Sequence, residues 1–299
     1  MFELIKDETK RDLGRQKFRC RICQSEGMYK TYLAREMMYG TKDEFKYFEC
    51  DNCRCMQIAD IPEDLSRYYQ EDYYSYEKTV EDGENIVFTN ETIDTPKTLD
   101  VGCGSGKHLL QLALAGHNNL YGCDPFLQKD IRYGDRVCIW KCDIHSIDRE
   151  MRFEKIIMED SFEHVTDPLE VLQSAHDLLT EQGVLEIHIP TYPNIAFELF
   201  GPHWFQLDPP RHITLHSVRS LRLLADRSGL KIIDMKYDSG NSQIIRSFFY
   251  QHGVPYFNMT SEMVEEYFTP DMMKEIDETV EKANREGFGD HVRVLLTRD

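Results

Sequence analysis

The 299-residue sequence lacks the marks of several common protein classes. It contains no apolar run near the roughly 20 residues that a membrane-spanning helix needs, and its first residues, MFELIKD, include no apolar segment typical of a signal peptide. Basic residues are scarce, with 35 Lys and Arg against 53 Asp and Glu and a formal net charge of -18. We therefore expect a cytoplasmic globular protein that neither inserts into a membrane nor binds long nucleic acid, whose phosphates need cationic partners.

Two nucleotide-binding patterns are also missing around the glycine cluster of residues 99–106, LDVGCGSG. Lys107 stands where the dinucleotide fingerprint has its third glycine, and His108 stands where a phosphate loop has Ser or Thr. What remains is a buried strand running into a turn almost without side chains. Such a turn lets a ligand without a pyrophosphate lie against the backbone.

A second strand, predicted at residues 120–123, ends in Asp124, about 20 residues after the glycine turn. A glycine turn followed by an acid at the next strand end predicts a nucleoside site at the carboxyl edge of a parallel sheet, with the acid on the ribose hydroxyls. The alternative is a tight strand-to-helix turn and an acidic helix cap, which explains either feature alone but not their spacing. Further strand ends add an adenine contact and neighbouring polar groups, so the predicted cofactor-binding residues are Asp100, Gly102, Gly104, Gly106, Asp124, Asp143, Asp160 and Ser161.

Four of the nine cysteines form two Cys-x-x-Cys pairs, with 26 residues between them. Thiolates spaced in this way present a tetrahedral set to zinc, so we predict a structural zinc site held by Cys20, Cys23, Cys50 and Cys53. Disulfides are the weaker alternative in a chain with no secretory signal. Cys55 is interpreted as an additional free thiol, since four ligands complete the site.

The pattern of strands and helices predicts an α/β architecture. Strands alternate with helices from about residue 98, which indicates a doubly wound, Rossmann-like sheet covered on both faces. We predict a zinc ribbon at residues 1–62, a Tyr-rich connector at 63–95 and a main domain at 96–299 with an insertion at about 238–287. The connector tyrosines pack between ribbon and main domain or, alternatively, cover a ligand.

These features together resemble a known family, the class I S-adenosylmethionine-dependent methyltransferases. The resemblance is to the bacterial group with an N-terminal zinc ribbon that is often linked to surface-polysaccharide biosynthesis. It rests on LDVGCGSG at 99–106, GCDP at 122–125, SFEHVTDP at 161–168, LDPPRH at 207–212 and the ribbon passages 35–41 and 48–53. It implies a seven-stranded sheet with an antiparallel final hairpin, and S-adenosylmethionine held by the glycine turn with Asp124 on its ribose.

The chemistry of such a cofactor limits what the protein must supply. A sulfonium methyl group is already activated, so the enzyme aligns the acceptor and removes a proton if the acceptor is a hydroxyl. Histidine is a suitable base near neutral pH, and the candidates on ligand-side loops are His212, His164 and His203, although a loop histidine is more often structural.

We predict methylation of a sugar hydroxyl on a small, surface-glycan precursor. The alternatives are C-methylation of a nucleotide-linked keto sugar and a non-catalytic zinc-ribbon interaction protein. A third, RNA methylation guided by the ribbon, is disfavoured by the net charge of -18.

Overall fold

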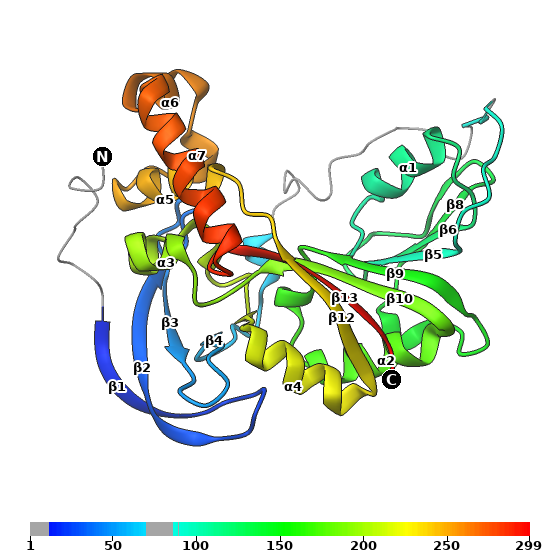
Figure 1. Cartoon of the computed structure of the whole chain (residues 1–299), viewed down its shortest axis with the longest axis horizontal. Helices are drawn as coiled ribbons and strands as arrows, with labels where there is room; N and C mark the ends of the chain where they lie inside the picture. The colour runs from blue at the N-terminus through cyan, green and yellow to red at the C-terminus, as the bar shows by residue number, and fades with distance from the viewer. Residues whose placement is uncertain (1–11, 70–85, 89) are drawn as a thin grey trace. The chain divides into compact units, whose positions relative to one another are not determined.

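The computed structural model describes residues 12–69, 86–88 and 90–299 (Figure 1). Residues 70–85 and 89 of the predicted Tyr-rich connector lie outside the described residues. By its contacts the chain forms two units, each described separately below. Unit 1 comprises the described residues of Met1–Tyr68, Pro190–Leu223 and Met235–Arg293, and unit 2 those of Tyr69–Ile189, Leu224–Asp234 and Val294–Asp299.

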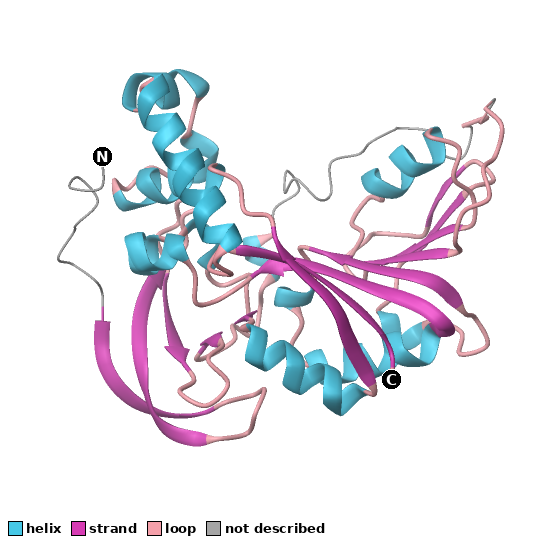
Figure 2. Cartoon of the chain, in the orientation of Figure 1, coloured by secondary structure: helices cyan, strands magenta, loops and turns pink. Residues whose placement is uncertain are grey.

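Unit 1 contains a five-stranded sheet in the order β1-β2-β3-β4-β11 (Figures 1 and 2). Its first four strands are antiparallel neighbours from the N-terminal segment, and the fifth comes from a segment some 155 residues later, where Thr214 pairs with Gln57 and Leu215 with Met56. The bounds are β1 Asp12–Arg19, β2 Glu26–Arg35, β3 Glu44–Glu49, β4 Met56–Ile58 and β11 Thr214–Leu215.

Helices from the second half of the chain complete unit 1. One hydrophobic core joins side chains of the N-terminal strands, such as Tyr32 and Tyr47, to Trp204, Phe249 and Val280 of later segments. Burial of these large side chains is the main stabilising contribution. The ribbon strands and the later segments therefore fold around a common core. The helices are α3 Ile195–Phe200, α5 Ser242–Gln251, α6 Ser261–Tyr267 and α7 Pro270–Arg285, with short turns η2 Ser66–Tyr68, η7 Gly201–His203, η8 Phe205–Leu207 and η9 Tyr256–Asn258.

Unit 2 contains most of a mixed eight-stranded sheet in the order β12-β13-β10-β9-β5-β6-β8-β7. The strands β10, β9, β5, β6 and β8 are parallel, as predicted. Their bounds are β5 Thr98–Val101, β6 Leu120–Cys123, β7 Ile131–Tyr133, β8 Val137–Trp140, β9 Phe153–Glu159, β10 Leu179–Pro190, β12 Leu230–Tyr237 and β13 His291–Arg298.

The sheet has eight strands where the resemblance implied seven. The additional strand is β7, which pairs antiparallel with β8 through Ile131 and Ile139. Gly134, at a φ of +52°, makes the tight turn between these two strands, and Tyr133 is buried in the cluster around Leu109. Three residues are too few to show a period in the sequence, which is why this strand was not predicted.

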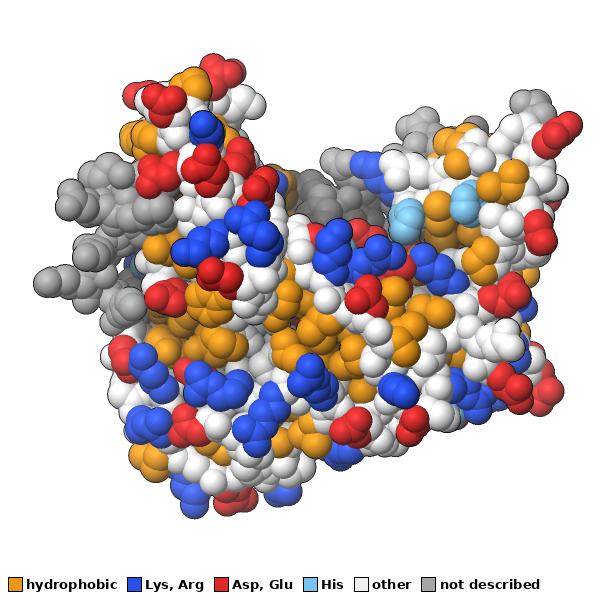
Figure 3. Space-filling view, in the orientation of Figure 1, with side chains coloured by type: hydrophobic (Ala, Val, Ile, Leu, Met, Phe, Trp, Pro, Cys, Tyr) orange, Lys and Arg blue, Asp and Glu red, His pale blue; other side chains and the backbone are white. Residues whose placement is uncertain are grey.

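The remaining helices are α1 Lys107–Leu114, α2 Pro168–Leu178 and α4 Val218–Ser228, with short turns η5 Ile144–Ser146 and η6 Phe162–His164. Leu221 and Leu224 of α4 are buried, as their spacing predicts. No helix in the described part of the chain combines the length and the apolar composition needed to cross a membrane. Acidic and basic side chains are intermingled on the face drawn in Figure 3.

Candidate functional site

The glycine turn lies between β5 and α1 in unit 2, and its glycines are required by both space and backbone conformation. A Cβ at Gly102 would lie 2.6 Å from the Cβ of Ser161, and one at Gly106 would lie 2.1 Å from Cδ1 of Ile139. Gly102, Gly104 and Gly106 all have positive φ, at +77°, +54° and +77°, a region that glycine occupies without strain. The turn is therefore bare backbone held tightly against its neighbours.

Asp124 directly follows β6 and is bonded to this turn. Its Oδ2 accepts a hydrogen bond from the backbone N–H of Gly104 at 3.0 Å, and its Oδ1 accepts one from Phe126 N–H at 2.8 Å. Burial raises the pKa of this carboxyl, and the two N–H donors oppose that rise. Each oxygen keeps further lone-pair capacity for a hydroxyl donor, so the arrangement fits a ribose ligand.

Ser161 and Asp160 follow β9 at the same sheet edge. The Ser161 hydroxyl donates to the carbonyl of Val101 at 2.8 Å, which joins the β9 end to the strand before the glycine turn. The backbone N–H of Asp160 donates to the carbonyl of His188, and Asp160 has a positive φ of +45°. Ser161 thus contacts the glycine turn, whereas the Asp160 backbone bonds the neighbouring strand β10.

Asp143, the predicted adenine contact, caps the short η5 turn. Its Oδ1 accepts from both the backbone N–H and the hydroxyl of Ser146, at 2.9 and 2.8 Å. This is the geometry of an N-cap carboxylate. The structure therefore gives Asp143 a local structural role.

Asp100 has ionisable neighbours that the sequence reasoning did not identify. His108 Nδ1 lies 3.9 Å from Asp100 Oδ2 and 3.8 Å from Glu159 Oε2, and His188 Nδ1 lies 3.8 Å from Glu159 Oε1. Burial, with the charges of Glu159 and Asp124, raises the pKa of Asp100 to about 7. Glu159 and His188 are paired in the register of β9 and β10. The sequence signal for this contact was therefore a carboxylate and a histidine near the ends of two predicted strands.

The four cysteines predicted to bind zinc converge in unit 1. Cys20 Sγ lies 3.5 Å from Cys53 Sγ, Cys23 Sγ lies 3.6 Å from Cys50 Sγ, and all four sulfurs are within 4.8 Å of one another. Zinc–sulfur bonds of about 2.3 Å in a tetrahedron place sulfurs about 3.8 Å apart, so these four thiols could hold a metal ion.

The two Cys-x-x-Cys turns share one backbone geometry. Cys20 N–H donates to Ser25 O and Gln24 N–H to Cys20 O, and the second turn repeats these bonds thirty residues later. The repeat comprises Cys50 N–H to Cys55 O and Arg54 N–H to Cys50 O, with positive φ at both Gln24 and Arg54. Each turn therefore points its two sulfurs at one place.

Cys55 lies closer to this set than its interpretation as an additional thiol implied. Its Sγ is 3.2 Å from Cys53 Sγ and 4.0 Å from Cys20 Sγ. The side-chain amide of Gln57 donates to the sulfurs of Cys20 and Cys55, at 2.9 Å each. Cys55 thus lies beside the four-cysteine cluster, and the Gln57 amide bonds both Cys55 and Cys20.

The three candidate histidines differ in their surroundings. In unit 1, His212 is 4% exposed, and its Nδ1 lies 2.7 Å from the carbonyl of Gln206. His203, also in unit 1, belongs to η7 and lines a cavity. In unit 2, His164 is partly buried in η6, with its Nδ1 3.2 Å from the Tyr69 hydroxyl.

A buried ionic network holds the segment before His212, and the sequence reasoning did not foresee it. Arg211 and Glu36 are both 0% exposed and form an ion pair at 3.0 Å, while Arg211 Nε donates to Asp208 Oδ2 at 2.7 Å. Arg211 also donates to the carbonyl of Tyr68. Two carboxylates and a carbonyl thus surround one guanidinium, as a buried charge requires.

The sequence of this chain matches a known protein family. Residues 77–235, more than half of the chain, match the family described as "Methyltransferase domain". No curated protein sequence matches the chain.

Several solved structures are similar at low identity. Coclaurine N-methyltransferase bound to N-methylheliamine and SAH is 13% identical, with 69% of this chain and 66% of that chain covered and a TM-score of 0.42. The cyclopropane synthase MmaA2 from Mycobacterium tuberculosis is 16% identical, with 71% and 80% covered and a TM-score of 0.42. The [4+2]-cyclase SpnF is 14% identical, with 71% and 76% covered and the same TM-score.

The family assignment rests on the sequence match. That match spans the glycine turn, Asp124 and the parallel strands described above. The chain therefore belongs to the methyltransferase-domain family and is an S-adenosylmethionine-dependent methyltransferase.

Proposed function

We propose that this methyltransferase methylates a hydroxyl group of a small, sugar-containing acceptor, a precursor of a surface polysaccharide. The resemblance of the ribbon passages and of LDPPRH at residues 207–212 to the bacterial polysaccharide-associated group supports this acceptor class. The acid-rich composition, with a net charge of -18, agrees with a small acceptor rather than a nucleic acid.

The residues of unit 2 fit the cofactor. Gly102, Gly104 and Gly106 offer bare backbone, and Asp124 keeps acceptor capacity for two ribose hydroxyls. When bound, S-adenosylmethionine supplies an electrophilic methyl group. We assign Asp100, Asp160 and Ser161 to the same site because they follow or end neighbouring strands at this sheet edge. We keep Asp143 as a contributor through Oδ2, because its bonds to Ser146 use Oδ1.

The observation that carries the proposed hydroxyl chemistry is the hydrogen bond of His212. A carbonyl can only accept, so His212 Nδ1 is the protonated nitrogen when it bonds Gln206 O at 2.7 Å. In the neutral ring, Nε2 is then the basic nitrogen, which is the form needed to take a proton from a hydroxyl. The Arg211 network fixes the preceding residue, so the ring position is set by buried contacts.

The other two histidines have different proposed roles. His164 bonds the Tyr69 hydroxyl in unit 2 and is the second candidate base. His203 lines a cavity in unit 1, so we assign it to ligand contact in that cavity and not to proton removal.

We further propose that Cys20, Cys23, Cys50 and Cys53 hold a structural zinc ion. Four thiolates fill a tetrahedral site and leave no open position, so this zinc would contribute to folding rather than to methyl transfer. The sulfur separations of 3.5 and 3.6 Å support the assignment.

The test is mass spectrometry of reactions with S-adenosylmethionine and a panel of nucleotide-linked sugars and glycan fragments. We expect a methylated sugar, with the new methyl carbon bonded to oxygen by NMR. A methyl group on carbon would instead identify the keto-sugar reaction, and no product from any sugar would overturn the proposed acceptor class.

The matched variants are His212→Gln and His252→Gln. His252 makes the same Nδ1-to-carbonyl bond at 2.7 Å, to Phe248 O, but is exposed at the C-cap position directly after α5. Loss of a general base lowers turnover by about 10²–10⁴-fold. We expect that fall in kcat for His212→Gln only, with an unchanged affinity for S-adenosylmethionine by calorimetry. Equal turnover in both variants would exclude His212 as the base.

A further inference from the structure

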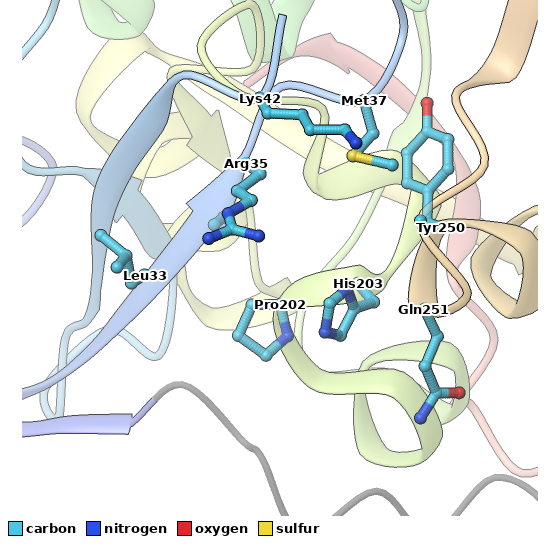
Figure 4. Close-up of a pocket in the computed structure, with 10 residues that line it drawn as sticks. Leu33, Arg35, Met37, Lys42, Pro202, His203, Tyr250 and Gln251 are labelled. Atoms are coloured by element: carbon cyan, nitrogen blue, oxygen red, sulfur yellow. The ribbon is translucent and has the colours of Figure 1, made fainter. Parts of the chain in front are cut away.

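A cavity of about 120 Å³ in unit 1 is lined by three basic side chains and by no Asp or Glu (Figure 4). Its walls come from the end of β2, the loop between β2 and β3, the η7 turn and the end of α5. Arg35, Lys42 and His203 contribute the basic groups. In a chain with 53 acidic and 35 basic residues, an acid-free cavity with this lining is suited to an anion.

The ammonium of Lys42 makes no ion pair with any residue that the structure describes. Its backbone has a φ of +60°, a conformation uncommon for a side chain of this size. The surrounding structure, and not the intrinsic backbone preference of lysine, therefore holds Lys42 in this conformation. Arg35 is paired, but its bonds to Glu44 use Nε and Nη2, so Nη1 remains available to a ligand.

The loop that carries Lys42 is fixed from inside by the carboxylate of Glu36. This carboxylate accepts hydrogen bonds from Tyr39 N–H at 2.9 Å and Thr41 N–H at 3.0 Å, and the N–H of Lys42 donates to the Glu36 carbonyl. The carbonyl of Met37 accepts from Tyr256 N–H at 2.8 Å. The cavity wall is therefore formed before any ligand binds, which lowers the cost of binding.

Tyr250 contributes its ring to the lining, and its hydroxyl points away from Arg35 and His203 (Figure 4). Its side chain is 3% exposed, and its hydroxyl, although buried, has no hydrogen-bond partner in the described structure. A buried hydroxyl without a partner costs free energy. Because the hydroxyl oxygen has almost no accessible surface, a ligand in the cavity contacts the ring of Tyr250 and not its hydroxyl.

We propose that this cavity binds a phosphoryl group of the acceptor, such as the diphosphate of a nucleotide-linked sugar. A phosphoryl group offers several charged acceptor oxygens to the donors of Lys42, Arg35 and His203, whereas a carboxylate offers two. The volume is well above the ~10–15 Å³ that one water needs, enough for an ionic headgroup. The identity of the ligand as the acceptor rests on the proposed function, whereas phosphoryl binding by the cavity does not.

The experiment is calorimetric titration of the full zinc-loaded chain with pyrophosphate, UDP, uridine and acetate. We expect binding of pyrophosphate and UDP but not of uridine or acetate. Lys42→Gln should weaken pyrophosphate binding at least about tenfold, because it removes a charged hydrogen bond. Lys46→Gln, an exposed lysine of β3 outside the lining, is the control and should change affinity less than about twofold.

The outcomes separate this proposal from the proposed function. If pyrophosphate gives no binding while S-adenosylmethionine binds normally, the cavity proposal fails and methyl transfer stands. If acetate binds as tightly as pyrophosphate, or if Lys42→Gln and Lys46→Gln behave alike, the phosphoryl assignment is wrong. If pyrophosphate binds at the cavity but no sugar is methylated, the acceptor class fails and the anion site stands.

Discussion

Unit 1 and unit 2 build their candidate sites by different means. The unit 2 site consists of backbone turns and carboxylates at the ends of neighbouring parallel strands, so short stretches of sequence define it. The site in unit 1 consists of sulfurs, a buried ion pair and basic groups brought together from residues up to 175 positions apart. Local motifs thus specify the candidate cofactor site and the cysteine cluster, whereas long-range packing specifies the buried ion pair and the basic cavity.

The largest expected effect is on unit 1, from loss of one of the four proposed zinc ligands. Cys20→Ser should reduce bound zinc from one ion per chain to less than half, because structural zinc binding contributes on the order of 10 kcal/mol. Elemental analysis and thermal unfolding would measure this. The control is Cys138→Ser. Cys138 is a half-buried thiol of β8 in unit 2, so this variant should keep one zinc ion per chain. Full zinc in the Cys20 variant would contradict the site.

Removing the charge at the centre of the buried network should have the next largest effect. Arg211→Met leaves Asp208 and Glu36 buried without their cation, which should lower the free energy of unfolding by about 3–5 kcal/mol. Urea unfolding is the measurement. Arg219→Met, whose exposed guanidinium bonds Asn52, should cost less than about 1 kcal/mol. Equal losses in the two variants would show that the network is not a major stabilising element of unit 1.

In unit 2, Asp100 should make stability depend on pH. Its pKa is about 7 in the folded chain and 3.8 as the ordinary value, so between these pH values the folded state keeps a proton that the unfolded state releases. The free energy of unfolding should therefore fall as pH rises from about 4 to 7, by at most about 4 kcal/mol, with no further fall above this window. Asp100→Asn should flatten this slope in urea unfolding series. An unchanged slope would show that Asp100 titrates normally.

The smallest expected loss of stability comes from the glycine turn, but it should affect cofactor binding specifically. Gly102→Ala combines a positive φ with a Cβ 2.6 Å from that of Ser161, at a cost of about 2–4 kcal/mol. Calorimetry with S-adenosylmethionine should show affinity at least about tenfold weaker. Gly240→Ala is the matched control, since its added Cβ meets nothing within 4 Å. Normal cofactor affinity in the Gly102 variant would remove the turn from the binding site.

Much of unit 2 could be predicted from sequence because its signals are local. Buried strands at 98–101, 120–123 and 137–140 read directly from apolar runs and turn residues, and the glycine turn with Asp124 lies within 25 residues. The spacing of the cysteines likewise predicted their convergence.

The rest of unit 1 could not be predicted because its partners are distant in the chain. Glu36 and Arg211 carry no pattern that links them, and each alone resembles an ordinary surface charge. Lys42 and His203 come from different elements and share a cavity only because Glu36 fixes one loop and core packing fixes the other. Two-residue β11 is too short to show a strand period.

The pairing of β11 with β4 limits how the N-terminal ribbon can be exchanged between relatives. The carbonyl of Ile213 accepts a hydrogen bond from the N–H of Ile58, and Thr214 and Leu215 continue the sheet. The Ser217 hydroxyl donates to the carbonyl of Cys53, a member of the four-cysteine cluster. In a chimaera that takes only the N-terminal strands from a second protein, the transplanted β4 would have to pair with a β11 segment from the other parent. A functional chimaera should therefore take residues 213–217 from the same parent as the N-terminal strands.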